Sequence, residues 1–280
     1  MTALSPAHAA QPVHWLLVHE LQDAGAAWLA RLWRQRLGAA ASQLLVLPAP
    51  ALTVCTRWQL QIDGDGTRSR LRVTLAGGAV FSIDSTQLRG VLHRPAAAWV
   101  PPVTLATPDR DYMAQERQAL LLAWLNGLGS RCINPPSTEA LCGPLWSAPQ
   151  WRWQAQRCDM PVLPWPDPTH ASSVPLLRLL VVGSRCFSVN GAPLGPAWHA
   201  AARRLACAVN CRVLGLYLVG DESTGWRFAQ ADAQCDLRPG GDAAVQALAA
   251  AMDMPVPPTA PRRTALPDPR PGLQPTAACL

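Results

Sequence analysis

Short apolar runs alternate with amphipathic stretches along the first half of the chain, and this pattern predicts strands separated by helices. Residues 14–20 form an apolar run, residues 24–37 have the helical period, and residues 43–47 are apolar again. Such a strand–helix–strand unit favours a parallel sheet with a right-handed crossover. The other elements predicted in this half are an antiparallel insert with strands at 57–62, 69–75 and 80–83, strands at 90–95 and 131–136, and helices at 111–128 and 148–158.

The second half opens with two apolar segments that are separated by Gly183 and Ser184, which is typical of a strand hairpin. Together with the pattern that follows, it predicts the order strand, strand, helix, strand, strand. The expected fold class is α/β, with a parallel-sheet N-terminal lobe that carries the antiparallel insert and a smaller α+β C-terminal lobe. The predicted ranges in this half are 176–183, 185–189, 196–209, 214–219 and 226–232.

Composition excludes several classes of protein. No apolar run approaches the roughly 20 residues that span a bilayer, and the N-terminus lacks the pattern of a secretory signal, so we expect a cytoplasmic protein without a membrane partner. The net charge of +6 is spread thinly, which argues against nucleic-acid binding. All 24 basic residues are arginines, so no lysine is available to hold phosphates or form a Schiff base. The nine cysteines include no Cys-x-x-Cys pair, which argues against zinc.

Three segments carry a resemblance. Gly90 to Pro95 reads Gly-Val-Leu-His-Arg-Pro and is followed by Tyr112, Glu116 and a long helix. Residues 132–136 read Cys-Ile-Asn-Pro-Pro, and residues 178–187 read Arg-Leu-Leu-Val-Val-Gly-Ser-Arg-Cys-Phe. In this order, the segments resemble the ATP-grasp superfamily, particularly the branch that couples carboxylates to amines on peptides.

The resemblance implies how the chain is divided. The N-terminal lobe is similar to the pre-ATP-grasp domain of that family, and the C-terminal lobe to a reduced ATP-grasp subdomain. Prolines cluster between the lobes and again beyond Met254, where they favour a linker and a disordered tail. The expected parts are a pre-ATP-grasp-like domain at 13–160, a Pro-rich linker at 161–175, a reduced C-terminal subdomain at 176–254 and a disordered tail at 255–280.

The departures from the family point to a lost reaction. The resemblance implies a subdomain that holds the nucleotide with lysines. In this chain, only the Pro-rich linker at 161–175 occupies the corresponding place. Tyr217 stands where the resemblance implies a metal-binding Asp, and Gln230 and Asp232 stand where it implies Glu-x-Asn. Mg²⁺ requires hard anionic oxygens and bridges the phosphates during transfer. These residues are therefore degenerate equivalents of a metal site, and we expect no catalytic residue, metal or ATP cofactor.

The candidate substrate-binding residues are Arg94, Tyr112, Glu116 and Arg178. The first three either line a retained peptide groove or form an internal ion pair that docks the long helix. His93, beside Arg94 at a strand end, is interpreted as structural rather than as a general base.

Arg178 lies inside an apolar run, and an unpaired buried guanidinium is very costly. It therefore either faces the space between the lobes or pairs with an acid such as Asp232 or Asp236.

The first hypothesis is a degenerate, non-catalytic ATP-grasp-like protein that binds a substrate peptide or completes a complex with an active ATP-grasp enzyme. The alternative is an active ATP-dependent carboxylate–amine ligase with an atypical metal site, which requires ATP and Mg²⁺. A third option is a binder of a small anionic metabolite. A nucleotide-affinity measurement separates the first two hypotheses.

Overall fold

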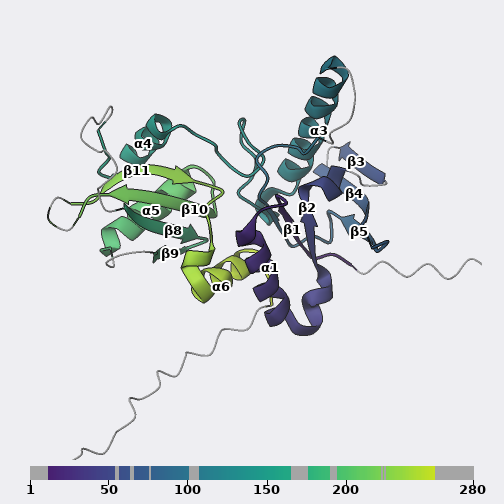
Figure 1. The fold of residues 1–280 in the computed structure, drawn as a ribbon, viewed down its shortest axis with the longest axis horizontal. Coiled ribbons are helices and arrows are strands. Elements are labelled where there is room, and N and C mark those ends of the chain that lie inside the picture. The colour runs from purple at the N-terminus through teal and green to yellow at the C-terminus, as the bar shows by residue number, and fades with distance from the viewer. Residues whose placement is uncertain are drawn as a thin grey trace, which may run out of the picture.

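The fold consists of two lobes, each built around its own sheet (Figure 1). The computed structural model describes residues 12–53, 57–63, 66–75, 77–100, 107–164, 176–189, 194–221, 223 and 225–255. The N-terminal lobe contains a parallel sheet with an antiparallel insert, and the C-terminal lobe contains an antiparallel sheet. The predicted α/β class is therefore confirmed. No helix in the described ranges is both long enough and apolar enough to cross a membrane.

The parallel sheet of the N-terminal lobe has the strand order β2-β1-β6-β7. Helix α1 links β1 to β2, as the strand–helix–strand pattern predicts. Asp23 caps α1 by accepting a 2.8 Å hydrogen bond from the amide of Ala26. The elements are β1 (Trp15–His19), α1 (Ala24–Leu37), a short 3₁₀ helix (Gly38–Gln43), β2 (Leu44–Pro48), α2 (Ala49–Thr53), β6 (Gly90–His93) and β7 (Cys132–Ile133).

The antiparallel insert comprises β3 (Arg57–Asp63), β4 (Gly66–Thr74) and β5 (Val80–Asp84). Its inner face packs on α3 (Thr107–Gly127), where the rings of Trp58 and Trp124 meet edge to face at 5.4 Å. Helix α3 begins before the predicted residue 111, and its first half projects beyond the rest of the lobe (Figure 1). A 3₁₀ turn (Gly129–Arg131) leads from α3 to β7.

The last four strands form one antiparallel sheet in the order β11-β10-β8-β9, as the sequence pattern predicts. Leu214, Leu216 and Leu218 of β10 pack on the side covered by α5. Helix α4 precedes the predicted linker in sequence, yet it packs on β11 of this sheet. The elements are α4 (Ala148–Gln156), β8 (Leu176–Val182), β9 (Arg185–Ser188), α5 (Pro196–Ala208), β10 (Val213–Val219) and β11 (Arg227–Asp232).

Helix α6 (Gly241–Ala251), which follows a 3₁₀ turn (Arg238–Gly240), was not expected from the sequence. It lies beside α1 at the junction of the lobes (Figure 1). The indole Nε1 of Trp15 donates a 3.0 Å hydrogen bond to the carbonyl of Met252, just beyond α6. One apolar cluster contains residues of both lobes, among them Trp33, Leu180 and Leu248. The lobes therefore share a core, which stabilises their contact by burying apolar surface.

Gly90 provides a test of this junction. A Cβ at residue 90 would lie 2.7 Å from the Cβ of Met252 and 2.9 Å from its carbonyl oxygen. We expect Gly90→Ala to lower the free energy of unfolding by about 2 kcal/mol, because the end of α6 has to move away from the sheet. Urea unfolding followed by tryptophan fluorescence measures this loss. Gly77→Ala is the matched control, since nothing lies within 4 Å of a Cβ there, and an equal loss in both variants would contradict the prediction.

Candidate functional site

The face of the C-terminal sheet opposite α5 brings together four residues that the resemblance singled out. Side chains alternate along β10, so Tyr217 lies on the other side from Leu216 and Leu218. In the ladder, Tyr217 pairs with Arg178 of β8 on one side and with Gln230 of β11 on the other. We call this surface, comprising Arg178, Tyr217, Gln230 and Asp232, the inter-lobe face.

Arg178 contacts the aromatic ring of Tyr217. Its guanidinium carbon lies 4.9 Å from the ring centroid, which is a cation–π contact. Burial raises the pKa of Tyr217, while the positive charge of Arg178 opposes this shift. The tyrosine therefore stays neutral and offers a ring face to the guanidinium instead of an anionic oxygen.

Asp232 is the one carboxylate among the four residues of the inter-lobe face. It lies opposite Gly215 in the ladder, and its Oδ1 accepts a 2.7 Å hydrogen bond from the amide of Gln234. This bond holds the carboxylate in a turn of its own chain. In the part of the chain that the structure describes, no group of three His, Cys, Asp or Glu residues could hold a metal ion. A phenol, an amide and one carboxylate do not fit the near-octahedral oxygen set of Mg²⁺.

Arg94 lies at the contact between the lobes and is 8% exposed. Its Nε forms an ion pair with Asp23 at the start of α1. Its two terminal nitrogens donate to the carbonyls of Gln234 and Cys235, at 3.2 and 3.4 Å, and the Gln234 side chain donates back to the Arg94 carbonyl at 2.6 Å. Arg94 thus joins three segments. Its acidic partner is Asp23, the N-cap of α1, and not a residue of α3 as an ion pair that docks the long helix would require.

The N-terminus of α1 already has two carboxylates beside it. Asp23 caps the helix, and Oδ1 of Asp236 lies 3.2 Å from the position of a Cβ at Gly25. Burial tends to raise the pKa of Asp236, but hydrogen bonds from Arg238 and the nearby charge of Arg178 bring it below its ordinary value. Asp236 is therefore ionised and favourably placed against the helix dipole. This helix end carries its own anions and is not arranged to receive a phosphate.

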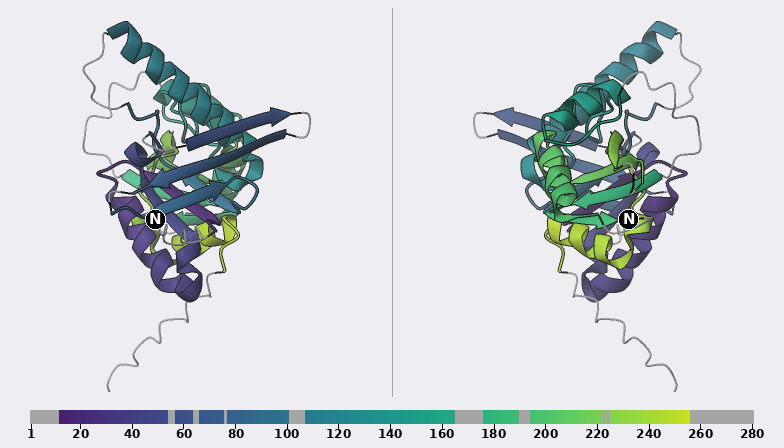
Figure 2. Two further views of the ribbon diagram at one scale, coloured as in Figure 1. Left: turned by 90° about the vertical axis from the view of Figure 1, so that its right-hand side faces the viewer. Right: turned by 90° about the vertical axis from the view of Figure 1, so that its left-hand side faces the viewer.

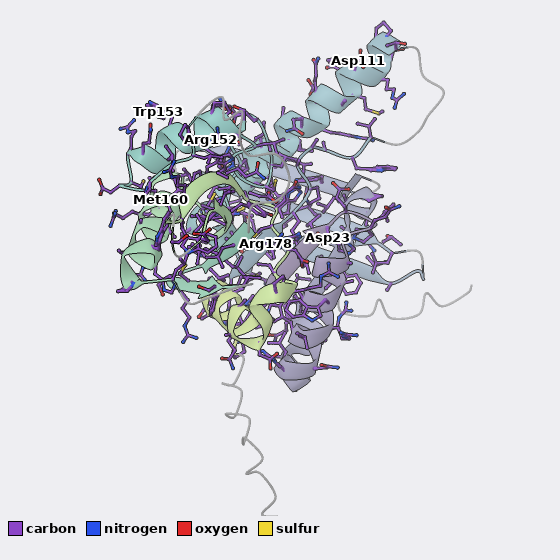
Figure 3. The ribbon with its side chains drawn as sticks, turned by 60° about the vertical axis from the view of Figure 1, so that its left-hand side comes forward. Asp23, Asp111, Arg152, Trp153, Met160 and Arg178 are labelled. Carbon is purple, nitrogen blue, oxygen red and sulfur yellow. The ribbon has the colours of Figure 1, made fainter. Side chains whose placement is uncertain are left out.

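Tyr112 and Glu116 are placed away from Arg94. Both are exposed on α3, and Tyr112 is 66% exposed. Figure 3 shows their neighbour Asp111 at the outer end of α3, whereas Asp23 and Arg178 lie in the body of the molecule. The structure does not bring the four candidate substrate-binding residues together, and a binding role for each of them stays a prediction.

The structure also reveals a residue whose role the sequence did not indicate. Asn134 follows β7, has a positive φ of 53° and is 2% exposed. Its Oδ1 accepts from the amides of Arg212 and Val213, both at 2.9 Å, and its Nδ2 donates to the carbonyls of Val213 and Ala233, at 2.7 and 3.2 Å. The Asn-Pro-Pro motif marked this position, but nothing local in the sequence points to partners about 80 and 100 residues away.

His93 is 2% exposed, and burial lowers its pKa to about 3. A histidine that stays neutral across the physiological range is not poised as a general base. This favours the structural interpretation of His93.

Comparisons with known proteins add a likeness of fold. No family model matches the chain, and no curated protein does either. Among solved structures, the macrocyclase MdnB from Microcystis aeruginosa MRC aligns with a TM-score of 0.57 at 14% identity, over 87% of this chain and 96% of that one.

Two more structures resemble the chain to the same degree. The macrocyclase MdnC from Microcystis aeruginosa MRC, bound with the precursor peptide MdnA, aligns with a TM-score of 0.59 at 9% identity, over 86% of this chain and 100% of that one. A Chryseobacterium gregarium RiPP-associated ATP-grasp ligase, in complex with ADP and a leader and core peptide, aligns with a TM-score of 0.61 at 8% identity. The alignment covers 86% of this chain and 96% of that one. The resemblance inferred from the three sequence segments is thus confirmed at the level of the fold: the chain has the fold of the ATP-grasp superfamily.

Proposed function

We propose that this chain is an ATP-grasp-like protein without ligase activity, which binds a substrate peptide or completes a complex with an active ATP-grasp enzyme. The observation that carries this proposal is the chemistry of the inter-lobe face. Tyr217, Gln230 and Asp232 supply one carboxylate, and the cation beside them is the Arg178 guanidinium stacked on Tyr217. Charge neutralisation by Mg²⁺ and lysine would provide most of the catalysis in an ATP-grasp reaction. We therefore expect no ATP or Mg²⁺ requirement.

The division into domains is part of the same proposal. A nucleotide-holding subdomain would have to lie between the end of the N-terminal lobe and β8. Residues 161–175 are too few for that, and positions 165–175 lie outside the described residues. We keep the boundaries 13–160, 161–175 and 176–254 as a proposal. The assignment of α4 within them is open to revision, because that helix packs on β11. The predicted disorder of 255–280 also lies outside the described residues, apart from Pro255.

Peptide binding is proposed by analogy with the structures of similar fold. MdnC was crystallised with a precursor peptide, and the C. gregarium ligase with a leader and a core peptide. In this chain, Arg178 is the candidate residue that lies on the inter-lobe face, where its guanidinium is held over the ring of Tyr217, and a fixed positive charge there suits an acidic or carbonyl group of a peptide.

Nucleotide titration tests the loss of the ligase reaction. We expect no saturable heat when ATP and Mg²⁺ are titrated calorimetrically into the full chain at concentrations up to about 1 mM. A dissociation constant of about 1 mM corresponds to a binding free energy of roughly −4 kcal/mol. Sub-millimolar, Mg²⁺-dependent affinity would overturn the proposal in favour of the active ligase.

Peptide binding is tested with the precursor peptide and the ATP-grasp ligase encoded in the same gene neighbourhood. We expect the chain to bind one of these two partners. If the partner is the peptide, Arg178→Met should weaken binding about tenfold, because a charge-assisted contact is lost. Arg203→Met, on the exposed side of α5, is the matched control and should bind like the unchanged chain. If neither partner binds, or if no such ligase is encoded nearby, the partner-subunit proposal fails even where nucleotide binding is absent.

A further inference from the structure

The antiparallel insert exposes a face on which basic side chains gather. Side chains of β4 alternate between buried and exposed, with Leu71 and Val73 packed toward α3. The exposed positions of β4 are occupied by Arg68, Arg70 and Arg72. Figure 2 shows the three strands of the insert as the outermost layer of this lobe, with their outer face toward the viewer in the left-hand view.

The strand register adds a fourth arginine and two amides to this face. Arg57 of β3 lies directly opposite Arg72, while Gln59 and Gln61 lie opposite Arg70 and Arg68. We call the surface made by Arg57, Arg68, Arg70 and Arg72 the arginine face. Like charges directly opposite each other destabilise a sheet, and a bound anion relieves this repulsion.

Among the side chains that the structure describes, one carboxylate accompanies the arginine face. Asp84 of β5 lies opposite Arg70 and forms an ion pair with it, with 2.9 Å between Oδ2 and Nε. The Arg70 side chain is nevertheless 74% exposed, so its remaining N–H groups are accessible. Asp84 also accepts hydrogen bonds from Thr86, at 2.9 and 2.6 Å, which fix its position beside Arg70. Among these described side chains, the positive charge therefore exceeds the negative charge.

The same face is hollowed. A groove of about 770 Å³ is lined by residues of all three strands: Gln59, Gln61, Arg68, Arg70 and Asp84 belong to this face, and Trp58, Leu60, Ser69 and Thr86 complete the lining. This volume is within the range of sites that hold ligands. Polar side chains form most of this lining, with Trp58 and Leu60 as its apolar members, which suits a hydrogen-bonding, charged ligand better than an apolar one.

The spacing of the arginines indicates the shape of the ligand. Residues two apart on a strand are separated by roughly 6.8 Å on one face, and alternate side chains of an extended peptide have the same spacing. Carboxylates at alternate positions of such a peptide can therefore meet Arg68 and Arg70 in turn through paired N–H donors, and Arg72 adds positive charge at the next position. An amide side chain such as that of Gln59 can bond the backbone of the same peptide.

Nucleic acid is the less suitable anion. Proteins that bind single strands combine basic grooves with aromatic rings on which the bases stack. The exposed β3 and β4 positions of this surface carry arginines and glutamines, and the aromatic ring that lines the groove, Trp58 of β3, is already engaged edge to face with Trp124. From the charge, spacing and shape of this surface, we infer that the arginine face binds an extended acidic peptide segment with carboxylates at alternate positions. The inference is independent of the inter-lobe face, since the two surfaces share no residue.

Fluorescence anisotropy with labelled peptides tests the inference on the full chain. The first probe is a peptide of six Glu-Thr repeats, and the second has the same composition with all glutamates in one block. We expect the alternating peptide to bind about threefold more tightly than the blocked one, because only its carboxylates match the arginine spacing. Raising the ionic strength should weaken both.

Matched variants locate the binding. The triple variant Arg68→Gln, Arg70→Gln, Arg72→Gln should bind the alternating peptide about tenfold more weakly, because the charge-assisted contacts are removed. The control variant Arg31→Gln, Arg34→Gln, Arg203→Gln removes the same charge from exposed helix positions and should change binding less than about twofold. Thermal unfolding by circular dichroism establishes that both variants are folded, and if the triple Gln variant is not, the corresponding triple Lys variant replaces it. Lysine keeps the charge and loses the paired donors. The affinity of the triple Lys variant should therefore lie between that of the unchanged chain and the tenfold weaker affinity expected for the triple Gln variant.

Three results would overturn the inference. The first is an absence of binding to either peptide at low ionic strength. The second is an equal loss of affinity in the triple variant and in its control. The third is tighter binding to a single-stranded oligonucleotide of equal charge than to the alternating peptide, which would assign the face to nucleic acid.

Discussion

Replacing Arg94 by Met should lower the free energy of unfolding by about 3–5 kcal/mol, the usual result of removing one partner of a buried ion pair. The Arg94 and Asp23 side chains are 9% and 13% exposed, so water cannot readily replace the lost contact. The carbonyls of Gln234 and Cys235 would lose their donor as well. Urea unfolding at neutral pH measures the loss. Arg94→Lys should recover only part of it, because an ammonium cannot reach all three acceptors in the same geometry.

A double-mutant cycle separates the ion pair from the other bonds of Arg94. Asp23→Asn removes the carboxylate charge while keeping a side chain that caps α1 well. We expect a coupling free energy of at least about 2 kcal/mol between the two substitutions, since the groups are in direct contact. Asp159→Asn is the control, because its pair with Arg204 is exposed and should contribute about 0.5 kcal/mol or less. If the coupling free energy between Arg94 and Asp23 is no larger than the contribution of the exposed Asp159–Arg204 pair, Arg94 does not hold the lobes together through Asp23.

The sequence predicted the sheets well because their signals are local. Each apolar run of the C-terminal lobe is bounded by its own turn residues, and the resulting four strands share one sheet. Alternation within β10 then places Tyr217 opposite the α5-facing leucines, so its convergence with Arg178 follows from register alone. The sequence left open whether Arg178 meets an acid or the space between the lobes. The structure adds the Tyr217 ring as a contact of Arg178. The sequence did not indicate this contact, because it does not show whether an aromatic residue packs in the core or stacks on a cation.

The contacts between the lobes were not predictable in the same way. The partners of Arg94 lie 71 to 141 residues away, and no periodicity relates them. Helix α6 was missed because it begins at the second of two glycines and its N-cap, Gly240, makes no side-chain hydrogen bond, while Asp242 is the one charged residue in an alanine-rich segment. Its stability comes from packing on α1 and in the shared core, which is tertiary information.

Asn134→Ala should be nearly as disruptive as the loss of Arg94. The substitution leaves the amides of Arg212 and Val213 and the carbonyls of Val213 and Ala233 without their partner. Each buried group left unsatisfied costs about 1–3 kcal/mol, although a small residue at position 134 can admit water and reduce the total. The positive φ adds about 1 kcal/mol of strain for alanine. We therefore expect a loss of about 3–4 kcal/mol in the free energy of unfolding.

Asn210 provides the matched control for backbone strain. Its φ of 52° is nearly that of Asn134, but its side chain is exposed. Asn210→Ala should therefore cost only the strain, about 1 kcal/mol, and Asn210→Gly should be close to neutral. Asn134→Gly removes the strain and keeps the loss of hydrogen bonds, so it should stay destabilised by about 2 kcal/mol or more. If Asn134→Gly unfolds at the same urea concentration as the unchanged chain, the four hydrogen bonds do not hold β10 to the N-terminal lobe. The contact between the lobes then rests on Arg94, α6 and the shared apolar core.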